Sequence, residues 1–177
     1  MIKPIDFRIY KGVKAKFGAV QFALKPPFTV CNKCNTRSNL DGVALCKCEG
    51  SYQDPEEGVI FVNICGPKGP NVYDWDNKIV FAMSVIDVGK TLAFLTSAGE
   101  GDQFSLLHDP GANTPAKGKT TKNLSISTPQ GLRTGCMFSM SQTTGEDRRS
   151  FTVPIAGDEV IILGTLLRAA IPRMLAW

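Results

Sequence analysis

The sequence predicts an α+β fold of antiparallel strands and two helices. Apolar and polar residues alternate with a period of two through most of the 177 residues, which is typical of strands that bury one face. Two stretches, one near the middle and one at the C-terminal end, instead carry apolar residues at helical spacing. Because each run of strands is followed by a helix, we expect antiparallel sheets rather than a parallel βαβ sheet.

Ten segments have the strand pattern, and turns rich in proline and glycine separate many of them. In chain order these segments are Phe7–Tyr10, Val20–Leu24, Phe28–Val30, Val43–Cys48, Gly58–Cys65, Lys78–Ser84, Gln103–His108, Lys122–Thr128, Gly135–Gln142 and Ser150–Ile155.

Both helical stretches carry boundary signals. Ser84 and Asp87 precede the first apolar run with the spacing of a capping box, and Gly99 is expected to cap its C-terminus. In the second stretch we expect Asp158 to cap the start. Pro172 should kink or end the last turn, because proline has no N–H to donate. This helix is apolar over most of its surface, so we expect it to be buried between layers or at a subunit interface.

Length and composition predict a single domain spanning residues 1–177. No apolar run reaches the roughly 18 residues that a membrane span needs, so we expect no membrane association. The N-terminal residues lack both a secretory signal and the pattern of a transit peptide. We therefore expect the protein to work where it is made or to have lost a targeting segment.

Charge is distributed unevenly along the chain. Residues 1–48 carry nine basic and two acidic side chains, residues 49–110 carry three and ten, and residues 111–177 carry eight and four. Basic ends around an acidic middle are compatible with one positive face, which would suit an anionic partner such as nucleic acid. An even scatter of charge over the surface explains the same counts equally well.

Catalytic motifs are absent from the sequence, so we expect that the protein is not an enzyme. The single histidine, His108, could form half of an acid–base pair, but the Asp109–Gly111 segment is a strong turn signal and favours a strand end. Tyr73–Asp76 offers two carboxylates, and we favour aromatic anchoring of a loop there. Cys65 and Cys136 stand in apolar strands and are expected to be buried thiols.

The remaining four cysteines form a candidate metal site. Their spacing is C-x2-C, eleven residues, then C-x-C, at Cys31, Cys34, Cys46 and Cys48. A C-x2-C turn places two thiolates together, and alternate residues of a strand point to the same face. These four soft ligands predict a structural zinc ion, and no other cofactor is expected. Two disulfides or four reduced thiols remain the alternatives.

Basic residues within this segment extend the candidate nucleic-acid surface. Lys33, Arg37 and Lys47 surround the cysteines, where their charge would lower the pKa values of the thiols. We interpret the segment at about 31–48 as an inserted, cysteine-rich hairpin whose Lys33, Arg37 and Lys47 lengthen the binding face.

Other basic clusters lie near the expected strand ends, with aromatic residues beside the first. Cations follow phosphates, and exposed aromatic rings stack on bases. Ordinary lysines in solvated loops would explain any one cluster taken alone. Besides Lys33 and Arg37, the residues that we predict to bind nucleic acid are Lys11, Lys14, Lys16, Phe17, Lys119, Lys122, Arg133, Arg148 and Arg149. Phe138 is a further aromatic residue, for which core packing is the favoured role.

Seven short motifs, in order, resemble those of the Whirly family of plant single-stranded-DNA-binding proteins. They are IYKG with Lys14-Ala15, VYDWDNKIVFAMSVIDVGKTLAFL, LLHDPG, KTTKNLSI, CMFSMSQ, FTVPIAGDEVIIL and IPRMLAW. The chain resembles still more closely the related kinetoplastid mitochondrial guide-RNA-binding proteins. The first motif departs from the family by one inserted residue, and the cysteine segment matches no part of the plant proteins.

This resemblance implies a fold, an assembly and a function. The fold would be Whirly-like, with two near-perpendicular antiparallel four-stranded sheets and two main helices. A tetramer would form through the helices, here a heterotetramer with a homologous subunit. The protein would be mitochondrial, would bind guide RNA through its phosphate backbone and would promote annealing of guide RNA to mRNA in RNA editing.

Two alternatives remain at this point. The chain could be a Whirly-type single-stranded-DNA-binding protein in organelle genome maintenance or transcription, or a structural subunit of a ribonucleoprotein. By position, Lys11 and Lys14 match lysines of the first family motif, whereas Lys119, Lys122 and Arg149 fall at strand starts in the second half.

Overall fold

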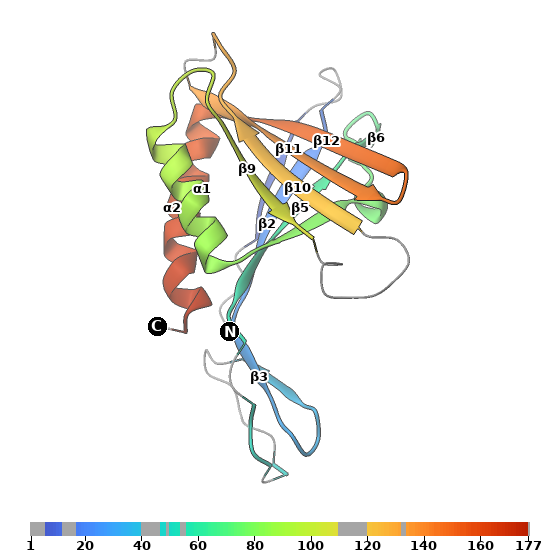
Figure 1. Ribbon diagram of the computed structural model, residues 1–177, viewed down its shortest axis with the longest axis vertical. Helices are drawn as coiled ribbons and strands as arrows, with labels where there is room; N and C mark the ends of the chain where they lie inside the picture. Colours follow the sequence, from blue (N-terminus) through green and yellow to red (C-terminus); the bar gives the residue numbers. More distant parts are fainter. Residues whose placement is uncertain are drawn as a thin grey trace.

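The structure is a computed structural model that describes residues 6–11, 17–39, 47–48, 50–53, 56–109, 120–131 and 134–176. Two four-stranded antiparallel sheets cross each other, and two helices lie side by side against them (Figure 1). The first sheet has the order β1-β2-β5-β8. Its strands are β1 (Asp6–Tyr10), β2 (Ala19–Lys25), β5 (Val59–Cys65) and β8 (Ile79–Met83).

The second sheet is a meander with the order β12-β11-β10-β9. Its strands are β9 (Gln103–His108), β10 (Thr120–Ser127), β11 (Gly135–Thr144) and β12 (Asp147–Ala156). All eight strands of the two sheets coincide with segments predicted from the sequence, so the predicted fold class is confirmed.

Smaller elements lie outside the two main sheets. The alternation of residues did not predict β4 (Arg37–Asn39), β6 (Pro67–Gly69), β7 (Val72–Tyr73) or the 3₁₀ turn η2 (Trp75–Asn77). Strand β3 (Phe28–Val30) was predicted and pairs with β4. Of the predicted strand Val43–Cys48, residues 43–46 lie outside the described residues, and the other two form a turn.

The core lies where the two sheets and the helices meet, because every second residue of the strands points inward. Phe22 of β2 and Phe138 of β11 contact each other edge to face, with ring centroids 5.6 Å apart. Phe138 is fully buried, so its favoured assignment to core packing is confirmed. From α2 (Gly157–Met174), Leu163, Leu167 and Ala170 complete the core.

Helix α1 (Val85–Ser97) begins as predicted. The Ser84 side chain accepts a hydrogen bond from the Asp87 N–H, and the Asp87 carboxylate accepts one from the Ser84 N–H. The predicted cap at Gly99 is wrong, because Ala98 ends the helix in an extended conformation and donates its N–H to the Phe94 carbonyl. The Gly99 N–H instead donates to the Asp102 carboxylate.

Helix α2 begins two residues earlier than the predicted cap at Asp158 allows. Ala156 is the N-cap, and its N–H donates to the Glu159 carboxylate at 2.7 Å. Asp158 therefore lies inside the first turn, where its negative charge still favours the helix dipole. Pro172 does not end the helix at once, because α2 continues to Met174.

The outer surface of the helices remains partly apolar. Ile86, Ile161 and Ile162 are exposed, and Ile161 retains 72% of its accessible surface. A single protomer therefore buries α2 on one side only. Within the described residues, no helix has the length and apolar character needed to cross a membrane.

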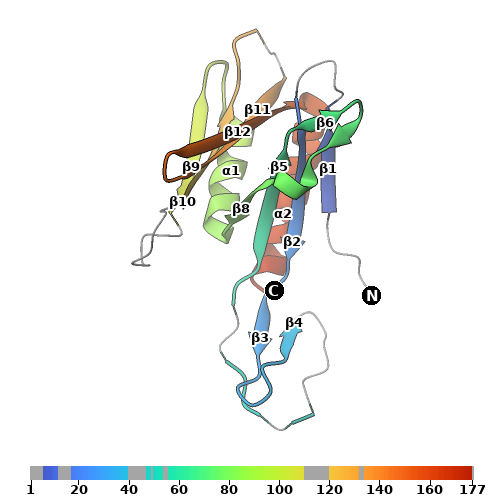
Figure 2. The same ribbon diagram turned by 90° about the vertical axis from the view of Figure 1, so that its right-hand side faces the viewer.

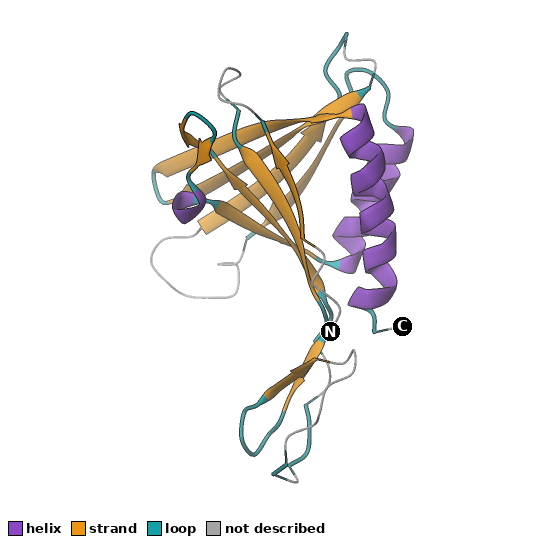
Figure 3. Cartoon of the chain, turned by 180° about the vertical axis from the view of Figure 1, so that it is seen from behind, coloured by secondary structure: helices purple, strands orange, loops and turns teal. Residues whose placement is uncertain are grey.

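A projecting segment, here called the cysteine arm, comprises the described residues from Pro26 to Glu57. It extends away from the sheets and helices (Figures 2 and 3). Where the arm returns to the first sheet, the Gly58 N–H donates to the Met174 carbonyl at 2.9 Å. A side chain at Gly58 would place its Cβ 2.8 Å from the Met174 Cα, so glycine is required for this close approach.

Candidate nucleic-acid interface

Two cations connect the second sheet to the edge of the first. Lys122 of β10 and Arg149 of β12 lie in one row of the sheet, because both pair with Gln142 of β11. The Lys122 ammonium donates to the Val80 carbonyl at 2.8 Å, and the Arg149 guanidinium donates to the Asn77 carbonyl at 3.2 Å. Both side chains therefore lie along the edge that carries β8.

The two positive charges influence each other. Partial burial, and then the positive charge of Arg149, lower the pKa of Lys122 below its ordinary value. Carbonyl oxygens orient these cations but do not neutralise them. A phosphate placed between the two side chains would relieve their repulsion.

An open groove of about 460 Å³ adjoins Lys122. One wall comes from the outer side of the first sheet and the other from the ends of β9 and β10. Its lining residues are Phe61, Val80, Ala82, Leu107, His108, Asp109 and Lys122. Leu107 is 70% exposed, which leaves an apolar surface beside a cation. Such a surface suits an unpaired base whose phosphate lies at Lys122.

His108 forms part of this groove and also holds α1 against β9. Its ring stacks on Phe81 with centroids 4.0 Å apart, and its Nε2 lies 3.2 Å from the Asp87 carboxylate. The same carboxylate caps α1 at Ser84. His108 ends β9 as the favoured interpretation required, although Pro110 and Gly111 lie outside the described residues. These contacts assign His108 a role in packing rather than in acid–base chemistry.

An aromatic cluster that the sequence analysis did not assign to binding lies at the start of the first sheet. Tyr10 is 49% exposed, and its ring lies 5.3 Å from that of Tyr73 and 6.4 Å from that of Trp75. The Tyr73 hydroxyl donates to the Lys11 carbonyl at 2.7 Å, so the predicted aromatic anchoring of this loop is confirmed. The exposed ring of Tyr10 is available for base stacking, and its place in the IYKG motif was the signal for it.

The structure gives Lys11 an acidic partner. Its ammonium forms an ion pair with the Glu159 carboxylate at the start of α2. Glu159 thereby compensates the charge that the sequence analysis assigned to phosphate binding. Phe17 is half-buried.

The predicted pair Arg148 and Arg149 does not act as a unit. Successive residues of a strand point to opposite faces, so only Arg149 faces β8, whereas Arg148 is exposed on the other face. In the arm, Lys33 and Arg37 are exposed, and the Arg37 guanidinium lies 4.9 Å from the Phe28 ring. The other predicted binding residues lie outside the described residues: Lys14, Lys16, Lys119 and Arg133.

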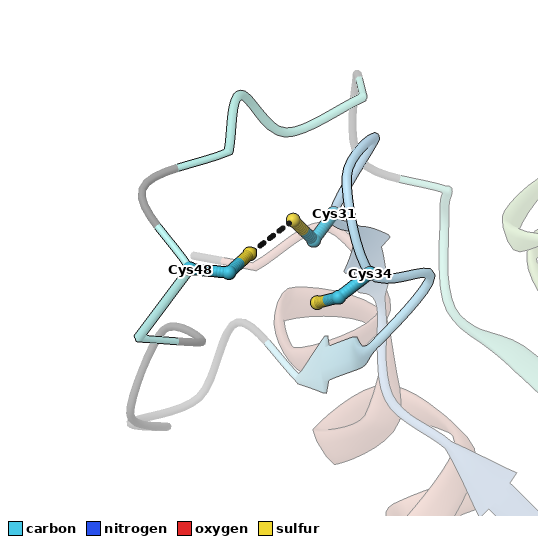
Figure 4. A group of neighbouring side chains, drawn as sticks. All are labelled: Cys31, Cys34 and Cys48. Atoms are coloured by element: carbon cyan, nitrogen blue, oxygen red, sulfur yellow. Dashed lines mark hydrogen bonds between the residues drawn. The ribbon is translucent and has the colours of Figure 1, made fainter.

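Three of the four predicted metal ligands lie together in the arm (Figure 4). The sulfur atoms of Cys31, Cys34 and Cys48 all lie within 4.8 Å of one another, and those of Cys31 and Cys48 are 3.3 Å apart. Cys46 lies outside the described residues. Three close cysteines can therefore hold a metal ion.

The other two cysteines are buried in the main sheets, as predicted. Burial raises the pKa of Cys65 to about 11 and that of Cys136 to about 12. Both thiols therefore stay protonated near neutral pH and are poor nucleophiles and metal ligands.

Comparison with known proteins places this geometry in a family. The family model described as Whirly transcription factor matches residues 9–166. The chain is 28% identical over 173 residues to "Single-stranded DNA-binding protein WHY1, chloroplastic" of Zea mays, covering 97% of this chain and 56% of that protein. It is 27% identical over 130 residues to "Single-stranded DNA-binding protein WHY2, mitochondrial" of Arabidopsis thaliana, covering 72% and 52%. The chain thus spans about half the length of these relatives.

Solved structures show the same fold. The crystal structure of WHY1 from Arabidopsis thaliana superposes with a TM-score of 0.73 at 22% identity, over 100% of this chain and 88% of that one. The structure of the plant transcriptional regulator PBF-2 gives a TM-score of 0.72 at 22% identity, over 100% and 85%. With the family model matched from β1 into α2 and the fold shared throughout, the chain belongs to the Whirly family.

Proposed function

We propose that this protein binds single-stranded DNA in an organelle, in genome maintenance or transcription. The observation that carries the proposal is the pairing of two cations, Lys122 and Arg149, with the apolar groove beside them. Family membership supports it, since the relatives are named as single-stranded-DNA-binding proteins of mitochondria and chloroplasts. Either organelle is compatible with these names.

The mechanism follows from the geometry of the interface. Phosphates bind at Lys122 and Arg149, while unpaired bases contact the exposed Leu107 in the groove. The ring of Tyr10 offers a second surface for stacking. Cations and apolar faces do not distinguish one base from another, so binding is largely independent of sequence. Nothing is chemically transformed.

Annealing of guide RNA to mRNA in a mitochondrion is the second candidate, and the motif resemblance to the kinetoplastid proteins favours it. The relatives found by comparison carry the names of DNA-binding proteins instead, so we place DNA first. RNA offers 2′-hydroxyl contacts that DNA lacks, so direct competition separates the two candidates.

Assembly and cofactor form part of the same proposal. The exposed Ile86, Ile161 and Ile162 support a tetramer through the helices, with identical or homologous subunits. The three close cysteine sulfurs support a structural zinc ion in the arm, away from the groove. Single-stranded nucleic acid is the expected partner.

Fluorescence anisotropy with labelled oligonucleotides of one sequence, as single-stranded DNA, single-stranded RNA and duplex DNA, tests the function. We expect tighter binding to single strands than to duplex, an affinity that falls with salt, and a preference for DNA over RNA. A preference for RNA would favour the second candidate. Absence of binding at low salt would refute both and favour a structural subunit.

A further inference from the structure

The cysteine arm has little apolar material with which to hold its shape. Strands β3 and β4 form only three residue pairs, and the buried side chains of the described arm are Pro27, Phe28, Thr29, Cys31 and Ser38. The Ser38 hydroxyl is buried without a hydrogen-bond partner. A segment with so small a core generally needs a covalent or metal staple.

The backbone brings the three sulfur atoms together from two separate segments. The Asn35 N–H donates to the Cys31 carbonyl at 2.9 Å, and Asn35 has a positive φ of 55°. This tight turn places Cys31 and Cys34 on the same side, and asparagine is among the few residues that tolerate such a φ. The Cys31 N–H donates to the Thr36 carbonyl at 3.1 Å and closes the turn.

The third sulfur arrives on the returning segment. The Asn32 N–H donates to the Ser51 carbonyl at 2.9 Å, and the Gln53 N–H donates to the Val30 carbonyl at 3.0 Å. Cys48 lies shortly before Ser51 in the sequence. Gly50 allows the approach, since a Cβ there would lie 2.6 Å from the Cys31 sulfur. Two paired segments thus position the sulfurs independently of the groove.

The chemistry of this site selects a thiophilic divalent cation. Cys31 is fully buried, and three thiolates within 4.8 Å of one another would repel strongly unless a cation lay between them. Two exposed cations of the protein, Lys33 and Lys47, neighbour the ligands in the sequence. A set of sulfur ligands is suited to zinc rather than to magnesium or calcium.

We propose that Zn²⁺ bound by Cys31, Cys34 and Cys48 replaces a hydrophobic core in the arm and folds it as a unit separate from the nucleic-acid groove. Each cysteine loses its proton when the metal binds, so three protons are released to solvent if all three thiols begin protonated. The ion is structural, and its removal unfolds the arm but leaves the two sheets in place.

Metal content and coordination give the first test. Chain purified without chelator or affinity tag should contain about one zinc ion, measured by elemental analysis. Replacement of zinc by Co²⁺ should produce thiolate-to-cobalt charge-transfer absorption. A zinc content near zero together with no such spectrum would overturn the proposal.

Variants test which cysteines bind the metal, and proteolysis tests whether the arm depends on it. Cys34→Ser and Cys48→Ser should each weaken Zn²⁺ affinity by more than about tenfold, whereas Cys65→Ala, outside the cluster, should retain the metal. Chelation should expose the arm of the wild-type chain to limited proteolysis while β9 to α2 remain intact. Equal zinc affinity in all three variants, or unchanged proteolysis after chelation, would refute the proposal. Failure to bind nucleic acid would leave these readouts unaffected.

Discussion

The Lys122 ammonium lies 2.8 Å from the Val80 carbonyl and so connects the second sheet to the edge strand of the first. Strand β8 pairs with β5 alone among the strands of its sheet, so its outer edge has carbonyl groups available for other donors. Lys122 uses one of them, at Val80, and Arg149 donates to the Asn77 carbonyl in the turn η2 just before β8. The same side chains thus orient the sheets and present positive charge beside the groove.

Replacement of Lys122 by methionine should weaken binding of single-stranded DNA. One phosphate contact contributes a salt-dependent factor of roughly five at 0.1 M salt, and the slope of log affinity against log salt should fall in magnitude by about 0.7. Loss of the charged hydrogen bond should also lower the free energy of unfolding by about 1–2 kcal/mol. Salt-titrated anisotropy and urea unfolding measure the two effects. Lys90→Met, at an exposed position of α1, is the matched control, and an equal loss of affinity in both variants would contradict a role for Lys122.

Arg149 and Arg148 provide a comparison between the two faces of one strand. Arg149→Met should weaken binding by a factor similar to that for Lys122, because its guanidinium faces the same edge. Arg148→Met removes the same charge from the opposite face and should have a much smaller effect at equal ionic strength. Anisotropy on both variants checks this difference. A larger loss of affinity in Arg148→Met than in Arg149→Met would indicate that the interface lies on the outer face of the second sheet.

Tyr10→Ala should weaken binding through lost stacking rather than lost charge. Stacking on an aromatic ring contributes about 1–3 kcal/mol per base, so the affinity should fall by roughly fivefold or more. The salt slope should stay as in the wild-type chain, and Tyr10→Phe should retain most of the affinity. A salt slope that changed with Tyr10→Ala would indicate that the substitution disturbs the cations instead.

The buried thiols predict a loss of stability at alkaline pH. Burial raises the pKa of Cys65 to about 11 and of Cys136 to about 12 in the folded protein, from about 9 for an exposed thiol. Above pH 9 the unfolded chain loses these protons first, so the folded state binds more protons and the free energy of unfolding falls as pH rises. Below the pKa of the unfolded thiols, near 9, the contribution of the two protonated thiols to stability is fully present.

Urea unfolding midpoints at about pH 8 and about pH 10.5 measure this dependence, because the first value lies below the pKa of the unfolded thiols and the second lies above it. The double variant Cys65→Ala, Cys136→Ala should show a shallower decline between the two pH values than the wild-type chain, although its stability is lower at both. A parallel decline in variant and wild type would assign the pH dependence to other groups.

Strands with one buried face were predictable because their side chains alternate. The residues of β11 follow this rule from Gly135 to Ser141. Strands β6 and β7 have no such alternation, since each forms through its pairing with the other. The predicted cap at Asp158 was wrong because Glu159, one residue further, reaches back to Ala156. The alternation of residues therefore located the strands. The start of α2 depended instead on which side chain forms the cap.

The candidate site was predictable in part for the same reason. Positive charge and a position at a strand start indicated Lys122 and Arg149 as residues that bind nucleic acid. The groove was not predictable, because Phe61 and Leu107 come from different sheets and meet only in the folded chain. The ion pair between Lys11 and Glu159 spans 148 residues of sequence, so no local pattern could show that this charge is compensated.

The hydrogen bond from Gly58 to the Met174 carbonyl places the root of the arm against the last turn of α2. The root of the arm is therefore held by the C-terminal turn of α2, although the two are far apart in sequence. A change at the last turn of α2 would therefore act directly on the Gly58 hydrogen bond at the root of the arm.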